Sequence, residues 1–208
     1  MSEPQKELPQ IYLLTPTAFE PDEFAPKLAA VLDAHEVACV RLALAAKDEY
    51  VLGKAADACR EVCHARDVAI VIESHVALAE RHGLDGVHLT DGARSIRKVR
   101  KVLGDDAIVG CFCGASRHDG LTAGEIGADY IAFGPVGETD LGDGTQAPRD
   151  LFDWWSQMIE VPVVAEGALT VEIVKDFAPV TDFFAVGDEI WSTEDPVKAL
   201  GDLIAAMG

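Results

Sequence analysis

Residues 127–136 read GADYIAFGPV, and an apolar run, Tyr130–Phe133, lies at their centre between Gly127 and Gly134. Further short runs rich in Val, Ile, Leu and Phe recur along the chain at Ile11–Thr15, Ala38–Leu44, Val68–Ile72, Gly86–Leu89, Ala107–Phe112, Val161–Ala165 and Phe183–Val186. Their apolar residues follow one another without the polar alternation of a half-buried strand. Unbroken apolarity is typical of strands covered on both faces. The pattern therefore predicts a parallel sheet of eight strands.

Segments with helical periodicity separate these runs, with apolar residues three or four positions apart. A short helix is expected at Val76–Arg81 between the third and fourth strands. Gly104 is expected to end the helix that follows the fourth strand. Thr170 is expected to cap a later helix, and Pro196 to lie in the first turn of the last helix. Strand and helix thus alternate through the whole chain.

This alternation, with no linker or break in composition, predicts a single (β/α)8 TIM barrel covering residues 1–208. Residues 1–10 are expected to form a short N-terminal extension. An open doubly wound sheet is the alternative architecture. The chain has no Gly-x-Gly-x-x-Gly after the first strand and no Gly-x4-Gly-Lys-Ser/Thr motif, which argues against binding of a dinucleotide or a nucleoside triphosphate.

The composition is that of a globular and strongly acidic protein. Of 208 residues, 49% are apolar and 25% charged, and 17 Lys and Arg against 36 Asp and Glu give a net charge of −19. Such a surface repels nucleic acid and anionic membranes. Five cysteines at no zinc-ribbon spacing, with no signal peptide or apolar run of about 18 residues, predict a cytoplasmic protein with reduced thiols.

In a barrel, the residues at the C-terminal ends of the strands carry the function. The long stretch Val136–Pro148 follows the sixth strand and is expected on the same face. The strand ends themselves carry Thr15, Arg41, Glu73, Ser74, His75, His88, Thr90, Asp91, Phe112, Cys113, Gly134, Glu166, Gly167, Asp188 and Glu189. The predicted rim is acidic and holds few cations.

The order of motifs resembles the thiamin-phosphate synthase and TenI superfamily of (β/α)8 barrels. Leu84-Asp-Gly-Val-His-Leu89 is similar to its Asp-Gly-Val-His-Leu signature, and Ile11-Tyr-Leu-Leu-Thr15 to its opening strand. Gly127-Ala-Asp-Tyr-Ile131 with Phe133-Gly-Pro-Val136 looks like its sixth strand, and Val161-Pro-Val-Val-Ala165 with Gly167 like its seventh. The resemblance implies transfer of an aminopyrimidine pyrophosphate onto a thiazole phosphate, with loss of pyrophosphate and with Mg²⁺ as cofactor.

The chain departs from the family where phosphate is held. The family's Gln-x-Arg-x-Lys of the second strand corresponds to Arg41, Ala43 and Ala45, so an arginine and a lysine are missing. Its Gly-Gly pair after the seventh strand is Gly167-Ala168, and its phosphate-facing serine after the eighth is Asp188. A carboxylate there opposes phosphate by about 4 kcal/mol for charges 4 Å apart at an effective dielectric of 20.

The chain also differs from the family's motifs at other strand ends. The family's Asn-Asp-Arg corresponds to Glu73, Ser74 and His75, its Gln-x-Asp roughly to Asp91, Gly92 and Ala93, and its Ser-Thr-His to Phe112, Cys113 and Gly114. Thr139 is retained from a Thr-x-Thr-Lys loop whose lysine is absent. A magnesium carboxylate is therefore poorly matched, and no metal ligands are assigned.

We expect the chemistry to lie with two groups of residues. Catalytic roles are assigned to Glu73, Asp91, Ser116, Arg117 and His118, and ligand contacts to Arg41, His88, Cys113, Thr139, Glu166, Gly167 and Asp188. The loop Ser116-Arg-His-Asp119 is notable because it brings a hydroxyl, a cation, an imidazole and a carboxylate to the catalytic face. Asp188 is expected to be costly to bury without a partner.

Structural explanations compete with several of these assignments. His88 fits a hydrogen-bonded core histidine, Cys113 fits inert packing, and Arg41 fits an ion pair with Glu73. Ser116 or Asp119 fits a helix cap.

Surface residues have alternatives of the same kind. The basic residues Arg94, Arg97, Lys98, Arg100 and Lys101 fit a solvated helix face, and Trp155 fits the core. Only Trp154 then needs an explanation, and a homo-oligomer contact is one.

The function expected from the resemblance is that of a thiamin-phosphate synthase-like transferase of thiamin biosynthesis with weakened or altered activity. The partner is a small molecule, and the acidic rim should favour a neutral or cationic ligand such as an unphosphorylated thiazolium. A non-catalytic or regulatory TenI-like barrel is one alternative. An unrelated lyase or isomerase using Ser116, Arg117, His118 and Glu73 is another.

Overall fold

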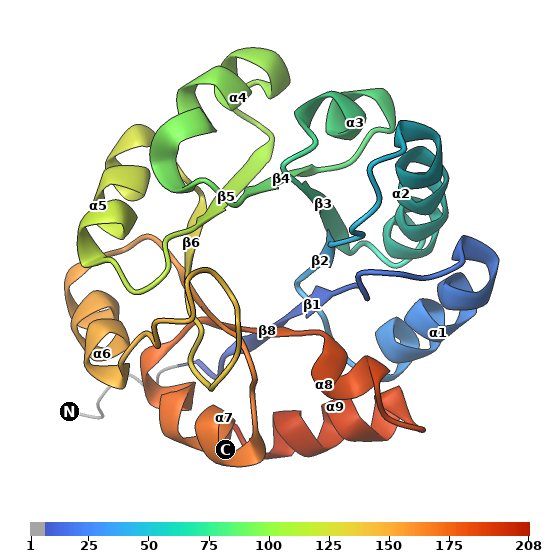
Figure 1. Ribbon diagram of the computed structural model, residues 1–208. Coiled ribbons are helices and arrows are strands. Elements are labelled where there is room, and N and C mark those ends of the chain that lie inside the picture. Colours follow the sequence, from blue (N-terminus) through green and yellow to red (C-terminus); the bar gives the residue numbers. More distant parts are fainter. Residues whose placement is uncertain (1–6) are drawn as a thin grey trace.

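The computed structural model describes residues 7–208, which form a closed parallel barrel with strands in the order β1 to β8 (Figure 1). The strands are β1 Gln10–Leu14, β2 Cys39–Leu42, β3 Ala69–Glu73, β4 Gly86–Leu89, β5 Ile108–Phe112, β6 Tyr130–Phe133, β7 Val163–Glu166 and β8 Phe183–Val186. Strand β8 closes onto β1, with Val186 opposite Leu13. The predicted (β/α)8 barrel is confirmed, and the open sheet is excluded.

Helices surround the barrel (Figure 1). They are α1 Pro21–Ala34, α2 Glu49–His64, α3 Val76–Arg81, α4 Ile96–Leu103, α5 Arg117–Ile126, α6 Arg149–Met158, α7 Val171–Phe177, α8 Asp188–Trp191 and α9 Pro196–Ala205, with the 3-10 helices η1 Gly92–Ser95 and η2 Ala178–Val180. The local signals behave as expected. The Thr170 hydroxyl accepts a hydrogen bond from the Ile173 N–H, Pro196 opens α9, and Gly104 ends α4 with φ of 84°. No helix within residues 7–208 is long and apolar enough to cross a membrane.

Two strand boundaries differ from the expectation in ways that affect the site. The seventh strand begins at Val163, after Pro162, which has no N–H to donate to the ladder, and it extends through Glu166. The third strand likewise includes Glu73. Both carboxylates therefore stand on strands rather than on the loops that follow them.

The apolar core has two layers. One lies between the sheet and the helices and extends from Ile11 to Met207, so we propose that the chain is one domain. Residues 1–6 of the expected N-terminal extension lie outside the described residues, and β1 begins at Gln10. The second layer fills the inside of the barrel, where Tyr12 and Tyr130 face small neighbours such as Ala132 and Ala185.

Strand β5 makes room for one of these rings. A Cβ on Gly110 would lie 2.0 Å from the Tyr130 ring, so only glycine fits opposite this tyrosine. Because side chains alternate along a strand, Arg41 and Glu166, which lie two positions after the inward-facing Cys39 and Val164, also turn inward near the carboxyl ends. The barrel interior is therefore polar toward its mouth.

The segment 134–148 between β6 and α6 covers part of this mouth (Figure 1). Gly142 lies so close to Phe112, at the end of β5, that a Cβ would be 2.9 Å from that ring. The Leu141 side chain lies near both Gly134 and Gly167. The long loop thus lies at the carboxyl ends of the strands, as its position after the sixth strand predicted.

Candidate functional site

Arg41 occupies the centre of the barrel mouth between two carboxylates. Its Nη1 donates to Glu166 Oε2 at 3.2 Å, and its Nη2 makes a second, shorter bond to Glu166 Oε1. Its Nε lies 3.2 Å from Glu73 Oε1, close enough for an ion pair but without hydrogen-bond geometry. The predicted Arg41–Glu73 pair is confirmed, and Glu166 is a second partner.

The three side chains differ in exposure. Arg41 is 3% exposed and the Glu166 side chain 5%, whereas 34% of the Glu73 side chain is accessible. Burial lowers the pKa of Arg41, but the negative charges of Glu166 and Glu73 outweigh this effect and the pKa is raised. Burial raises the pKa of Glu73, and Arg41 offsets that only in part. One positive and two negative charges leave this cluster at −1 when both acids are ionised.

Below Arg41, two tyrosines and a histidine form a buried hydrogen-bonded row. The Tyr12 and Tyr130 hydroxyls are 2.5 Å apart, and the Tyr130 hydroxyl is 2.9 Å from His88 Nδ1. The Arg41 guanidinium lies 5.6 Å from the Tyr12 ring centroid. Burial lowers the pKa of His88, and Arg41 lowers it further, so His88 is neutral. The hydrogen-bonded core reading of His88 is confirmed.

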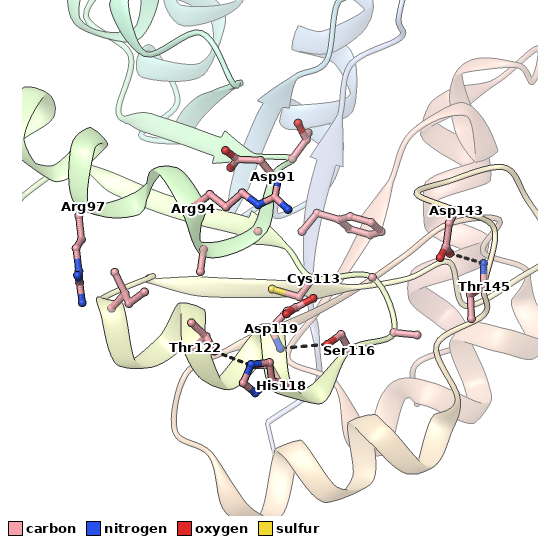
Figure 2. Close-up of a pocket in the computed structure, with 17 residues that line it drawn as sticks. Asp91, Arg94, Arg97, Cys113, Ser116, His118, Asp119, Thr122, Asp143 and Thr145 are labelled. Atoms are coloured by element: carbon pink, nitrogen blue, oxygen red, sulfur yellow. Dashed lines mark hydrogen bonds between the residues drawn. The ribbon is translucent and has the colours of Figure 1, made fainter.

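A cavity of about 890 Å³ opens beside the barrel axis, between the segment after β4 and the beginning of α5 (Figure 2). It brings together four of the predicted site residues, namely Asp91, Cys113, Ser116 and His118. Arg94, Arg97, Asp119, Thr122, Asp143 and Thr145 also line it. Glu73 and Arg117 are not among the lining residues, so the set expected for a lyase or isomerase is not assembled.

Several lining side chains have structural partners. The Ser116 hydroxyl accepts from the Asp119 N–H and caps α5, as the alternative reading proposed. The Asp91 carboxylate accepts from the Ser95 hydroxyl at 2.7 Å. In Figure 2, Arg94 extends toward Asp91, while Arg97 lies at the outer edge of the cavity. The cavity therefore carries both signs of charge.

Arg94 and Arg97 were assigned to a solvated helix face, and both are exposed at the edge of this cavity. Their helical spacing is equally typical of a solvated face. Only the packing of η1, which carries Arg94, and of α4, which carries Arg97, beside α5 gives them a place in the cavity. Arg100 has a structural role, since its Nη2 pairs with Asp129 at 2.7 Å.

Arg117 and Trp154 pack against each other. The guanidinium carbon of Arg117 lies 4.0 Å from the centroid of the Trp154 ring, a cation–π contact between α5 and α6. This contact turns Arg117 away from His118 and the cavity. The adjacent Trp155 is fully buried and donates its indole N–H to the Val161 carbonyl, which confirms its place in the core. A homo-oligomer remains a prediction, but Trp154 no longer requires one.

The thiols of Cys111, on β5, and Cys113, directly after β5, lie 3.7 Å apart. The hydrogen bond to Cys111, together with burial, raises the pKa of Cys113. A thiol with a raised pKa is a weak nucleophile because the thiolate is the reactive form. Cys113 is therefore a lining residue of the cavity and not an activated nucleophile.

The ends of β7 and β8 show a different acid from the one expected. Asp188 is exposed, in a depression that it shares with Trp191 and Phe19, so the cost expected for burying it does not arise. Glu189 instead turns back: its Oε1 accepts from the Leu169 N–H at 3.1 Å and its Oε2 from the Gly187 N–H at 2.7 Å. Asp188 and Glu189 are the first two residues of the four-residue helix α8, and their side chains point to different sides of it. The order of residues in the sequence alone could not show which of the two faces the mouth.

Two further predicted contacts lie on this side of the mouth. Gly167 has φ of +100°, and a Cβ there would be 2.8 Å from Pro135, so backbone conformation and packing already require glycine. Thr139 is exposed in the segment after β6.

The carboxylates of the mouth do not fit a magnesium site. Glu73 and Glu166 both face the Arg41 guanidinium, whose charge disfavours a cation beside it. Within residues 7–208 no group of three or more His, Cys, Asp or Glu side chains is arranged to hold a metal ion.

Comparisons with known proteins identify a matching family model and similar proteins. A family model described as thiamine monophosphate synthase, TMP-TENI, matches residues 11–190. The thiamine-phosphate synthase of Rhodospirillum centenum is 43% identical over 206 residues, covering 95% of this chain and 97% of that protein. That of Erythrobacter litoralis is 36% identical over 211 residues, covering 97% and 99%.

Among solved structures, the thiamine phosphate pyrophosphorylase of Pyrococcus furiosus is similar, with a TM-score of 0.82 at 19% identity over 95% of each chain. A 3-hexulose-6-phosphate synthase has a TM-score of 0.71 at 16% identity, covering 96% of this chain and all of that chain. These two likenesses show the fold.

Proposed function

The chain belongs to the thiamine monophosphate synthase family, TMP-TENI, and from this membership we propose that it acts in thiamin biosynthesis as a thiamin-phosphate synthase-like protein with altered handling of phosphate. The family reaction joins an aminopyrimidine pyrophosphate to a thiazole phosphate and releases pyrophosphate. We place the ligand at the C-terminal mouth, between the Arg41 cluster and the cavity lined by Asp91 and His118.

The observation that carries the altered handling is the state of Arg41. It lies two residues before Ala43 and four before Ala45, where the family has an arginine and a lysine, and both of its sides are occupied by carboxylates. A guanidinium already paired with Glu166 and Glu73 has little attraction left for a pyrophosphate. We expect weak pyrophosphate binding and slow turnover.

The same charges favour ligands of the opposite sign. Glu73 is the one member of the cluster with a substantially accessible carboxylate, and Arg41 does not cancel the two acids together. A thiazolium or another cationic nitrogen heterocycle would complete the neutralisation. We therefore assign Glu73 as a ligand-binding acid, while Asp91, Ser116 and His118 offer polar groups to the remainder of the ligand.

Binding and turnover should be measured separately. We would follow the melting temperature with thiamin, unphosphorylated thiazole, thiazole phosphate and pyrophosphate, each with and without Mg²⁺, because a ligand of the native state raises it. Thiamin should give the largest shift and pyrophosphate the smallest. Glu73→Gln should reduce the thiamin shift, with Asp188→Asn as a control of equal charge change at an exposed site. Micromolar binding of pyrophosphate to the wild type would contradict the proposal.

Turnover is tested by incubating the protein with aminopyrimidine pyrophosphate, thiazole phosphate and Mg²⁺ and quantifying thiamin phosphate by chromatography. Slow formation is expected. The second candidate function is a non-catalytic ligand-binding barrel, and the pairing of Arg41 with two carboxylates favours it. That function predicts thermal shifts with thiamin-type ligands and no product.

The location and assembly of the protein are part of the same proposal. A cytoplasmic protein with reduced thiols agrees with five buried cysteines that are all free. A homo-oligomer is testable by light scattering.

A further inference from the structure

Two backbone N–H groups from separate loops converge on one side chain at the mouth. The Leu169 N–H, beyond the end of β7, donates to Glu189 Oε1 at 3.1 Å, and the Gly187 N–H, directly after β8, donates to Glu189 Oε2 at 2.7 Å. Each carboxylate oxygen thus has its own donor. We call Leu169 N–H and Gly187 N–H the amide pair.

The backbone just before Leu169 has an uncommon conformation, with two successive residues at positive φ. Gly167 and Ala168 have φ of +100° and +51°, and positive φ at a non-glycine residue such as Ala168 is uncommon. Leu169 is 5% exposed, and Gly187 is buried. Two donors in such surroundings need an acceptor, because a buried N–H without one is costly.

In (β/α)8 barrels, the loops after strands 7 and 8 frequently bind phosphate through their backbone. Here that place is taken by a carboxylate of the same chain. A phosphate brought to the amide pair would lose these two donors to Glu189 and would face its negative charge as well.

We propose that Glu189 is a specificity-determining residue, which occupies the amide pair in place of a ligand phosphate and so selects a ligand without phosphate at this end of the mouth. The inference rests on the proposed function for the location of the ligand. It names the ligand class more closely, as a thiazole-type molecule that carries a hydroxyl where a phosphorylated one carries phosphate. Asp188 does not share this role, because its exposed side chain lies in the depression with Phe19 and Trp191.

The test compares two variants of equal charge change at adjacent positions. Glu189→Ala frees the amide pair, whereas Asp188→Ala removes one negative charge and leaves the amide pair occupied. The dissociation constant of inorganic phosphate is measured by isothermal titration for the full chain and both variants, without any substrate. Glu189→Ala should bind phosphate at least tenfold more tightly than the wild type, and Asp188→Ala should stay within about twofold.

Equal tightening in both variants would show a general charge effect and overturn the proposal, as would wild-type binding as tight as that of Glu189→Ala. If Glu189→Ala does not fold by circular dichroism, Glu189→Gln carries the test, because its amide has one acceptor oxygen in place of two and so leaves one N–H of the amide pair free. It must bind phosphate more tightly than Asp188→Ala.

The preference between thiazole alcohol and thiazole phosphate gives a second measurement. The wild type should bind the alcohol more tightly, and Glu189→Ala should reverse the order. Because inorganic phosphate binding needs neither turnover nor a thiazole site, failure of the proposed function would leave the phosphate difference between the two variants intact.

Discussion

Removal of the Glu166 charge should destabilise the barrel more than removal of the Glu73 charge. Arg41 is 3% exposed, and Glu166 satisfies two of its nitrogens, so Glu166→Gln leaves a buried guanidinium with a single poorly aligned carboxylate. Breaking a buried ion pair by removing one partner costs about 3–5 kcal/mol. Because Glu73 remains 3.2 Å from Arg41 Nε, we expect the lower end, about 3 kcal/mol.

The expected loss is large enough to measure in two ways. For chains of about 150–250 residues, 1 kcal/mol shifts the melting temperature by about 2–4 °C, so Glu166→Gln should lower it by about 6–12 °C. Urea denaturation should give the same loss in the free energy of unfolding. Glu73→Gln is the matched control on the same arginine, and its loss should be smaller because its partner bond is poorly aligned and partly exposed to water.

A double variant separates pairing from packing. Replacement of a buried ion pair by apolar residues of similar volume is often neutral or stabilising, so Arg41→Met with Glu166→Leu should recover most of the stability lost in Glu166→Gln. A Glu166→Gln protein within about 1 kcal/mol of the wild type would refute the reasoning, since the value would then fall in the range of a surface pair.

Other measurements test the barrel interior and α5. Because the pKa of His88 is lowered on folding, the unfolded chain binds more protons below its usual value of about 6.5, so stability should fall as pH drops through that value; His88→Gln should flatten this slope in urea titrations between pH 5 and 7. Tyr130→Phe leaves two buried groups without a partner and should cost about 1–3 kcal/mol by urea denaturation, more than Tyr12→Phe, after which Tyr130 still reaches His88. Gly120→Ala should destabilise by about 1–3 kcal/mol because its Cβ would lie 2.8 Å from a buried ring, whereas Gly124→Ala, with ordinary contact at 3.4 Å, should gain up to about 1 kcal/mol from helix propensity; equal thermal shifts in the two glycine variants would contradict the packing argument.

The fold could be predicted because its signals are local. The run Tyr130–Phe133 and the helix Val76–Arg81 lie where apolarity and periodicity placed them, since both patterns depend on neighbouring residues only. Strand ends were less predictable. A charged residue at the end of an apolar run usually indicates that the strand has ended. Glu73 and Glu166 nevertheless belong to their strands, because Arg41 on β2 pairs with both carboxylates.

The site was predictable as a set of strand ends and not as a set of contacts. Sequence order alone puts Ser116, Arg117 and His118 together, but α5 turns successive residues by about 100°, so Arg117 packs on Trp154 while Ser116 and His118 line the cavity. The pairing of Arg41 with Glu166 joins residues 125 positions apart, and no pattern in either strand announces it.

The acid at the end of β8 shows why a sign of charge is easier to predict than its position. Asp188 and Glu189 are adjacent, and either one makes this part of the rim acidic, so the sequence supports a mouth that disfavours phosphate whichever residue is responsible. The Glu189 side chain, longer than that of Asp188, can reach back and accept from the N–H of Gly187, two residues earlier, and from the N–H of Leu169 in the preceding loop.

An aspartate at 189 would be one methylene shorter, so Glu189→Asp should weaken this contact while keeping the charge. If phosphate binding is governed by the occupied donors, Glu189→Asp should bind phosphate more tightly than the wild type in the same titration. If it is governed by charge alone, the two proteins should bind phosphate equally.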